Sequence, residues 1–242
     1  ASSHADELQV INASAEGGIS IINGDSSMGH IYFGDTSGAA QGRIDYNHGG
    51  DYMRLYTANT ERLRITNAGR IFIGNPSGRS PGSLTPQFQI EGTDVSTSSM
   101  SLTRNSDNSG APSFIFNKTR GSSVGDDTIV NSGDTLGIIQ FVGNDGENSD
   151  NVAAWIVGKV DGTPGVDDMP GRLEFYTTAD GSNTTTERMR ITSGGFVGIN
   201  AASPETTLHV HGSALIEDTI GNSLRVRSTV GNGNDPTFYF EK

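Results

Sequence analysis

The stretch Glu61-Arg62-Leu63-Arg64-Ile65-Thr66-Asn67-Ala68-Gly69-Arg70-Ile71-Phe72-Ile73-Gly74 occurs twice in this chain of 242 residues. It returns at a constant offset as Glu187-Arg188-Met189-Arg190-Ile191-Thr192-Ser193-Gly194-Gly195-Phe196-Val197-Gly198-Ile199-Asn200. Each copy predicts two alternating strands joined by a polar turn. The alternation places Leu63, Ile65, Ile71 and Ile73 on one side and Arg62, Arg64 and Thr66 on the other. Repetition at this scale is typical of a repeat architecture.

A second element repeats as Leu8–Asn12, Phe88–Gly92 and Leu208–Gly212. Its last residue is Asn or Gly, and Gly74 of the first long repeat is likewise Asn200 in the second. Gly and Asn share a tolerance for positive φ that β-branched residues lack. We therefore expect positive φ at the following equivalent positions: Asn12, Gly92, Gly212, Gly74 and Asn200.

These repeats divide the chain into units. A lead-in at residues 1–7 precedes a first unit at 8–87, a longer second unit at 88–207 and the start of a third at 208–242. The extra length of the second unit is interpreted as an insertion at about 117–170. Short strands are expected at residues 19–22, 31–33, 100–104, 114–116, 224–227 and 238–240, with two more in the insertion at 135–142 and 152–160.

The composition indicates an all-β chain that needs partners. Apolar residues make up 33% of the sequence and charged residues 18%, while 33 residues are glycine. This mixture suits short strands and tight turns, and we find no convincing helical periodicity. An 80-residue unit so poor in apolar side chains buries too little surface alone. We expect the repeat positions Leu63, Ile65, Met189 and Ile191 at or near a core between chains of a parallel homotrimer.

The net charge of −12 argues against nucleic acid and anionic membranes as partners. The longest apolar run, Val152–Val157, is far shorter than the ~20 residues of a membrane span. The chain has no cysteine, which excludes disulfides and thiolate metal sites. Because it starts without methionine and stops inside a repeat, we expect it to be a piece of a longer protein.

The pattern Glu187–Asn200, followed by Ser203-Pro204 and Leu208-His209-Val210, resembles the repeats of bacteriophage tail fibres. The runs Gly133–Phe141, Val160–Gly165 and Gly171–Gly181 are similar to the same proteins, in which such units often precede an endosialidase-type intramolecular chaperone. Phe72 departs from the pattern, where the family usually has glycine as at Gly198. The resemblance implies an extracellular, homotrimeric β fibre on the virion, in contact with other fibre or tail proteins.

Candidate chemical sites have mostly structural interpretations. The acid pairs Asp126-Asp127 and Asp167-Asp168 lie in loops, and neighbouring strand residues point to opposite faces. His209 and His211 share a strand face, but a metal site needs more ligands. The acidic stretch 144–150 lacks the ligand order of a calcium loop. We therefore expect no catalytic residue, no cofactor and no metal.

For two sets of side chains the sequence allows either a structural role or a binding role. Arg62, Arg64, Arg188 and Arg190 are predicted to form an outward basic stripe, either for pairing with acids of another chain or for binding sugar or phosphate. Trp155 lies within an apolar run, which favours a packed strand position over a contact with host glycan.

The sequence thus predicts a non-enzymatic shaft segment of a phage tail fibre, which extends and positions a receptor-binding tip. One alternative is an adhesin module that binds host cell-surface glycan through loops of the insertion. The other is a tailspike that degrades glycan, which would need two carboxyl groups ~5–10 Å apart in a cleft.

Overall fold

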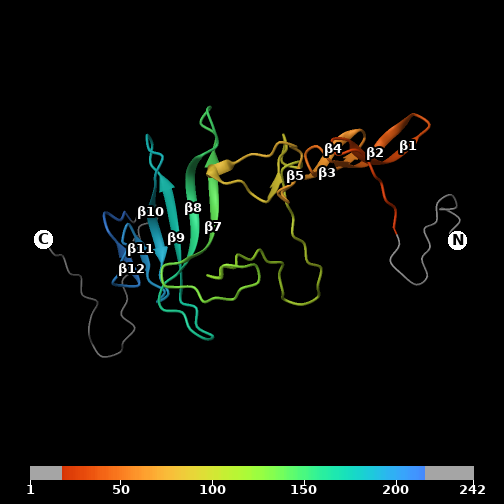
Figure 1. Cartoon of the computed structure of the whole chain (residues 1–242). Helices are drawn as coiled ribbons and strands as arrows, with labels where there is room; N and C mark the ends of the chain where they lie inside the picture. Colours follow the sequence, from red (N-terminus) through yellow and green to blue (C-terminus); the bar gives the residue numbers. More distant parts are fainter. Residues whose placement is uncertain (1–17, 216–242) are drawn as a thin grey trace, which may run out of the picture. The chain divides into compact units, whose positions relative to one another are not determined.

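The computed structural model of the chain describes residues 18–215. These residues are built almost wholly from β-strands and loops, which confirms the all-β prediction (Figure 1). The chain divides into two compact units, Ala1–Phe114 with Asn144–Asn151 and Ile115–Gly143 with Val152–Lys242. Each unit is organised around one six-stranded sheet.

The first sheet holds its strands in sequence order: β1 (Met28–Asp35), β2 (Gly38–Asn47), β3 (Tyr52–Thr57), β4 (Thr60–Ile65), β5 (Ile71–Ile73) and β6 (Phe88–Ile90). Strands β1 to β5 pair antiparallel, whereas β6 pairs parallel with β5 after a crossover that contains a short 3-10 turn, Pro81–Ser83. The fold is therefore a meander of hairpins closed by one parallel strand.

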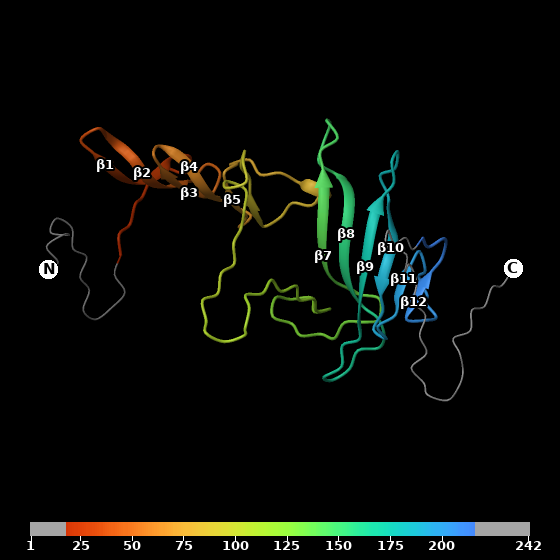
Figure 2. The ribbon, with the colours of Figure 1, turned by 180° about the vertical axis from the view of Figure 1, so that it is seen from behind.

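The second sheet repeats this plan, as the row of arrows in Figure 2 shows. Its strands are β7 (Thr135–Gly143), β8 (Asn151–Val160), β9 (Gly171–Thr178), β10 (Thr185–Ile191), β11 (Val197–Ile199) and β12 (Leu208–Val210). The final pair, β11 and β12, is again parallel. The repeated sequence thus forms β4–β5 in one sheet and β10–β11 in the other.

The sheet order corrects the position of the extra length in the second unit. The strands expected at 135–142 and 152–160 exist as β7 and β8, but they occupy the places that β1 and β2 hold in the first sheet. They are therefore part of the repeat and not additions within an insertion at 117–170. The surplus residues lie mainly in the stretch between β6 and β7, which contains no strand.

The other predicted short strands have three different outcomes. Residues 31–33 lie in β1, as expected. Residues 19–22, 100–104 and 114–116 form no strand. The segments expected at 8–12, 224–227 and 238–240, and Asn12 with them, lie outside the described residues.

The strand register aligns apolar side chains in rows that cross each sheet. Alternate residues of a strand share a face, so these rows define the apolar face of each sheet. In the first sheet the rows are Ile31–Ile44–Leu55–Leu63–Ile73–Ile90 and Gly29–Tyr46–Met53–Ile65–Ile71–Phe88. In the second they are Ile156–Phe175–Met189–Ile199–Val210 and Gly158–Leu173–Ile191–Val197–Leu208.

A β-bulge interrupts the alternation at the same place in both sheets. Glu61 pairs with Tyr56 and Leu63 with Leu55, so Arg62 is an extra residue between them. The second sheet has the same shift between Glu187 and Met189. A bulge changes which face the following residues occupy.

This bulge corrects the predicted basic stripe. The Nε of Arg62 donates to the hydroxyl of Thr57 at 3.0 Å, and Thr57 shares the face of Leu55. Arg188 bonds Thr177 in the same way, also at 3.0 Å. Arg62 and Arg188 therefore lie on the opposite side of the strand from Arg64 and Arg190, and the four do not form one stripe.

Most of the predicted turn conformations are confirmed. φ is +89° at Gly74, +53° at Asn200 and +139° at Gly212. The prediction is wrong at Gly92, whose φ lies outside the positive region. Glycine is required there for another reason, because a Cβ atom would collide with Thr97.

The crossover length explains why Phe72 departs from the repeat pattern. In the first sheet the longer crossover, residues 74–87, covers the ring of Phe72, which is 6% exposed. In the second sheet the crossover spans residues 200–207, and a side chain at Gly198 would collide with the carbonyl of Ala201. A short crossover therefore requires glycine, whereas a long one accommodates an aromatic side chain.

Candidate functional site

The face opposite the apolar rows carries charged side chains, and we call it the charged face of each sheet. In the first sheet it is centred on Asp45, which is 1% exposed. The carboxylate of Asp45 accepts hydrogen bonds from Arg43 at 3.2 Å and Arg54 at 2.9 Å, and lies 3.0 Å from Nδ1 of His30. Burial opposes ionisation, but these bonds outweigh it and hold the pKa of Asp45 below its ordinary value.

A second carboxylate on this face, that of Glu61, is held by side chains of its own strand β4 and of the neighbouring strand β3. Glu61 receives two hydrogen bonds from the guanidinium of Arg64, at 2.8 and 2.9 Å, and one from the hydroxyl of Tyr56 at 3.1 Å. The guanidinium of Arg43 stacks 3.4 Å above the ring of Tyr56. Charged and aromatic groups therefore cover one another across β2, β3 and β4.

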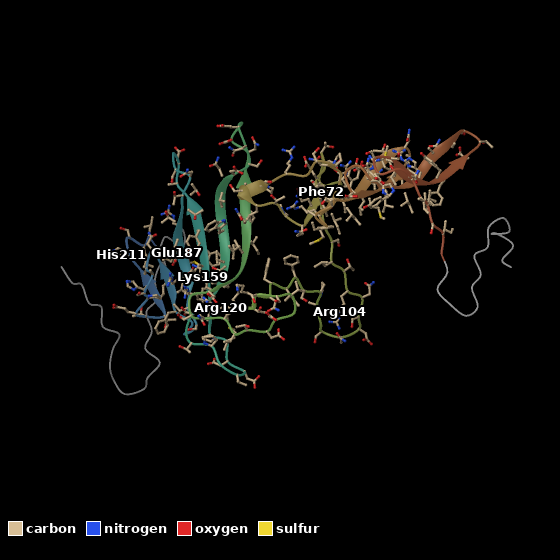
Figure 3. The ribbon with its side chains drawn as sticks, viewed as in Figure 1. Phe72, Arg104, Arg120, Lys159, Glu187 and His211 are labelled. Carbon is tan, nitrogen blue, oxygen red and sulfur yellow. The ribbon has the colours of Figure 1, made fainter. Side chains whose placement is uncertain are left out.

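The charged face of the second sheet has the same plan, and Figure 3 marks Lys159 and Glu187 on it. Its centre is Glu174, 1% exposed, which accepts from Arg172 and Tyr176 at 2.6 Å each and pairs with Lys159 at 2.7 Å. Burial of Glu174 is offset by these three partners, which lower its pKa to about 2. Burial, together with the bond to Glu174, raises the pKa of Tyr176.

The two charged faces use opposite residues at one position. The register makes Glu174 the counterpart of Arg54, and Val157 the counterpart of Asp45. A buried acid is therefore supplied by β2 in one sheet and by β9 in the other. Both charged faces therefore contain a cluster of mutually neutralised ions, but the residue types at equivalent positions differ. The two sheets do not share a set of side chains that could bind the same ligand.

Trp155 occupies the position of Arg43 in this scheme. Its half-buried ring meets the ring of Tyr176 edge-on, with centroids 5.9 Å apart, as Arg43 covers Tyr56. The indole nitrogen is buried and has no hydrogen-bond partner in the described structure. This environment supports a packing role, which the sequence favoured over glycan contact.

The other acids singled out in the sequence serve turns. Asp126 accepts from the backbone amides of Ser122 and Ser123 at 3.0 and 2.9 Å. Asp145 does the same for residues 147 and 148, at 2.9 Å each. Asp168 closes a small turn with Gly165. These contacts give the loops their shape.

No group of three or more His, Asp or Glu side chains that could hold a metal ion occurs among residues 18–215. His209 lies in β12, with a buried Nδ1 that has no hydrogen-bond partner in the described part, while His211 is exposed beyond the strand. The pair therefore gathers no further ligand.

The apolar face is more exposed than the charged face. Gly29 is the one buried residue in its four rows, and the others are half-exposed or exposed; Leu55 is 38% exposed and Leu208 60%. By contrast, Phe72 and Val157, two of the few buried apolar side chains, lie in the rows of the charged face. This inversion is the main feature of the molecule that sequence reasoning missed, although the repeated Glu-Arg-x-Arg spacing signals the ion pairs.

The described residues contain no helix long and apolar enough to cross a membrane. Neither a protein-family model nor a curated protein matches the sequence.

Solved structures do match. The carboxy-terminal domain of the bacteriophage T5 L-shaped tail fibre is 16% identical, with a TM-score of 0.57, and the match covers 98% of this chain and 97% of that one. The same domain solved with its intra-molecular chaperone domain is also 16% identical, with a TM-score of 0.64 over 92% of this chain and 72% of the other. The chain thus shares the fold of a phage tail fibre domain.

Proposed function

We propose that this chain is a non-enzymatic shaft segment of a phage tail fibre, assembled on the virion as a parallel homotrimer. The observation that carries the proposal is the open apolar face. In each sheet two rows of mainly aliphatic and aromatic side chains stay half-exposed or exposed, while a carboxylate on the reverse face is buried.

The energetics of burial favour an assembly. Burying a Leu, Ile or Phe side chain contributes roughly 1.5–3 kcal/mol, so a half-exposed row forgoes on the order of 1 kcal/mol per residue. Large exposed apolar patches mark interaction surfaces in soluble proteins. Covering these rows with equivalent rows of two further copies places Leu63, Ile65, Met189 and Ile191 between chains.

The shared fold supports a role in a tail fibre, with other virion fibre or tail proteins as neighbours. A shaft role is supported by the repeat itself, since stacked units produce an extended body. The acids of the charged face are neutralised by fixed partners, so they are poor candidates for acid–base work on glycan. A receptor-binding tip would then lie elsewhere in the fibre.

Light scattering on the purified chain tests the assembly. We expect a trimer, and we expect Ile65→Asp on the apolar face to dissociate it while Asn67→Asp in the exposed turn does not. A stable, folded monomer would overturn the proposal.

Incubation of the assembled chain with host cell-surface polysaccharide tests the shaft role. We expect the polysaccharide to remain intact and any binding to be weak. Cleavage would support the tailspike alternative, and tight binding would support an adhesin.

A further inference from the structure

Two segments of the chain lie extended but unpaired. Residues 19–22 and 100–104 belong to no strand, and neither makes a backbone–backbone hydrogen bond within the described structure. The contacts of the second segment are local: Ser101 with Thr103 at 3.3 Å, and Arg104 (labelled in Figure 3) with Asn108 at 3.1 Å.

Both segments carry the side-chain pattern of a strand. Met100 and Leu102 alternate with polar residues, and they are 59% and 50% exposed. In the first unit Ile19 and Ile21 flank Ser20 in a similar way and are 64% and 45% exposed, and Ile22 after them is also apolar and exposed. Alternation over such a length is typical of a half-buried strand. Here the backbone of both segments has no partner in the described structure, and Met100 and Leu102 stay exposed, while the side chain of Ile21 lies against Gly29 of β1.

A comparison with residues 105–113 shows that residues 100–104 do not have the composition of a linker. Residues 105–113 read Asn-Ser-Asp-Asn-Ser-Gly-Ala-Pro-Ser, a polar composition typical of flexible connections. Residues 100–104 differ sharply from this neighbouring stretch. A segment that served only as a spacer between β6 and β7 would not require exposed apolar side chains such as Met100 and Leu102.

We propose that residues 100–104 form a β-strand with a neighbouring copy of this chain, and that residues 19–22 do so in the first unit. The inference rests on the homotrimer proposed above and assigns part of its interface to strand addition between chains. An extended segment can gain main-chain hydrogen bonds at an open sheet edge, with alternate side chains supplying the apolar contact.

Two observations point to a second copy as the occupant. The unpaired segment recurs, once before β1 and once between β6 and β7, so its partner must present a matching surface in each unit. This chain does so, because each described sheet ends in strands that are paired on one side only, β1 and β6 or β7 and β12, beside a half-exposed apolar face. Each copy thus carries both an unpaired segment and a sheet that could receive one, but the two do not pair within the described residues of one chain. Pairing between copies would give the segment its hydrogen bonds and cover the sheet.

Hydrogen–deuterium exchange on the assembled full chain, read by mass spectrometry, tests the inference. Amides of residues 101–104 should exchange roughly 100-fold more slowly than those of 105–110, since pairing protects amides and exposed loops are unprotected. Equal, fast exchange in both stretches of a trimer whose β9 and β10 stay protected would overturn the strand assignment and leave the shaft proposal intact. A folded monomer would remove both.

Proline substitution gives a second readout, because proline removes an amide donor from a paired strand. Leu102→Pro should lower the thermal dissociation midpoint of the trimer by roughly 5 °C or more. Ser109→Pro is the matched control in the exposed polar stretch and should leave the midpoint unchanged. An unchanged midpoint for Leu102→Pro, or equal shifts for both variants, would contradict the inference.

Discussion

Glu187 and Arg190 lie three residues apart in β10, yet their side chains meet on one face of the sheet through two hydrogen bonds of 2.6 Å. In a regular strand this spacing would place them on opposite faces. The bulge at Arg188 supplies the extra residue that brings them together, and Glu61 and Arg64 repeat the arrangement in the first sheet. The repeated Glu-Arg-x-Arg spacing therefore encodes a bulge and an ion pair together.

Removing the charge of this pair should destabilise the fold. Glu187→Gln leaves the half-buried guanidinium of Arg190 without its strongest partner, and we expect a loss of about 1–3 kcal/mol. Chemical denaturation of the assembled chain measures the loss. Glu205→Gln, at an exposed acid, is the matched control and should change the free energy of unfolding by less than ~0.5 kcal/mol. Equal effects would show that the pair contributes nothing specific.

The sequence predicted those elements in which local pattern and fold agree. The hairpins β4–β5 and β10–β11 follow from alternating Leu63, Ile65, Met189 and Ile191 around polar turns. The face of Arg62 could not be predicted, since a bulge shifts the two-residue period without a strong local signal.

Strand pairing and crossover length were also beyond local reasoning. Residues 114–116, Phe-Ile-Phe, have high strand propensity but form no strand, although Phe116 lies against Gly137 of β7, because strand formation depends on tertiary context as well as on propensity. The difference between Phe72 and Gly198 depends on how closely a following crossover approaches, which is a tertiary property. Buried ions at Asp45 and Glu174 likewise depend on partners from several strands.

Acid should destabilise the fold through Glu174. Its pKa is lowered from an ordinary 4.5 to about 2, so its contribution is fully present above pH 4.5 and is lost as the pH falls towards 2. The shift corresponds to a contribution on the order of 3 kcal/mol. Thermal unfolding between pH 5 and pH 2 checks this, and Glu174→Gln should flatten the profile across this range. An unchanged profile would contradict the assignment.

Phe72 and Gly198 occupy equivalent positions, but a smaller side chain should destabilise the fold at Phe72 and a larger one should destabilise it at Gly198. Gly198→Ala forces a methyl group against the carbonyl of Ala201, and we expect a loss of more than ~1 kcal/mol. Phe72→Ala empties the space beneath the longer crossover, with an expected loss of about 3–5 kcal/mol. Gly194→Ala is the control, since its added Cβ would meet nothing closer than 3.8 Å. Calorimetric melting of the three variants distinguishes packing at this position from a general intolerance of glycine replacement.

Asn200 should accept glycine but not valine. Its φ of +53° lies in the left-handed region, and its amide donates to the carbonyl of Arg188 at 2.9 Å, which holds the turn after β11 in place. Asn200→Gly keeps access to this conformation and should change the free energy of unfolding by only a few tenths of a kcal/mol, about the size of a surface substitution. Asn200→Val introduces a β-branched side chain and should cost more than ~1 kcal/mol. Denaturant titration of both variants measures the difference. If valine were tolerated as well as glycine, the conformation at this repeat position would not be the reason that Gly and Asn alternate there.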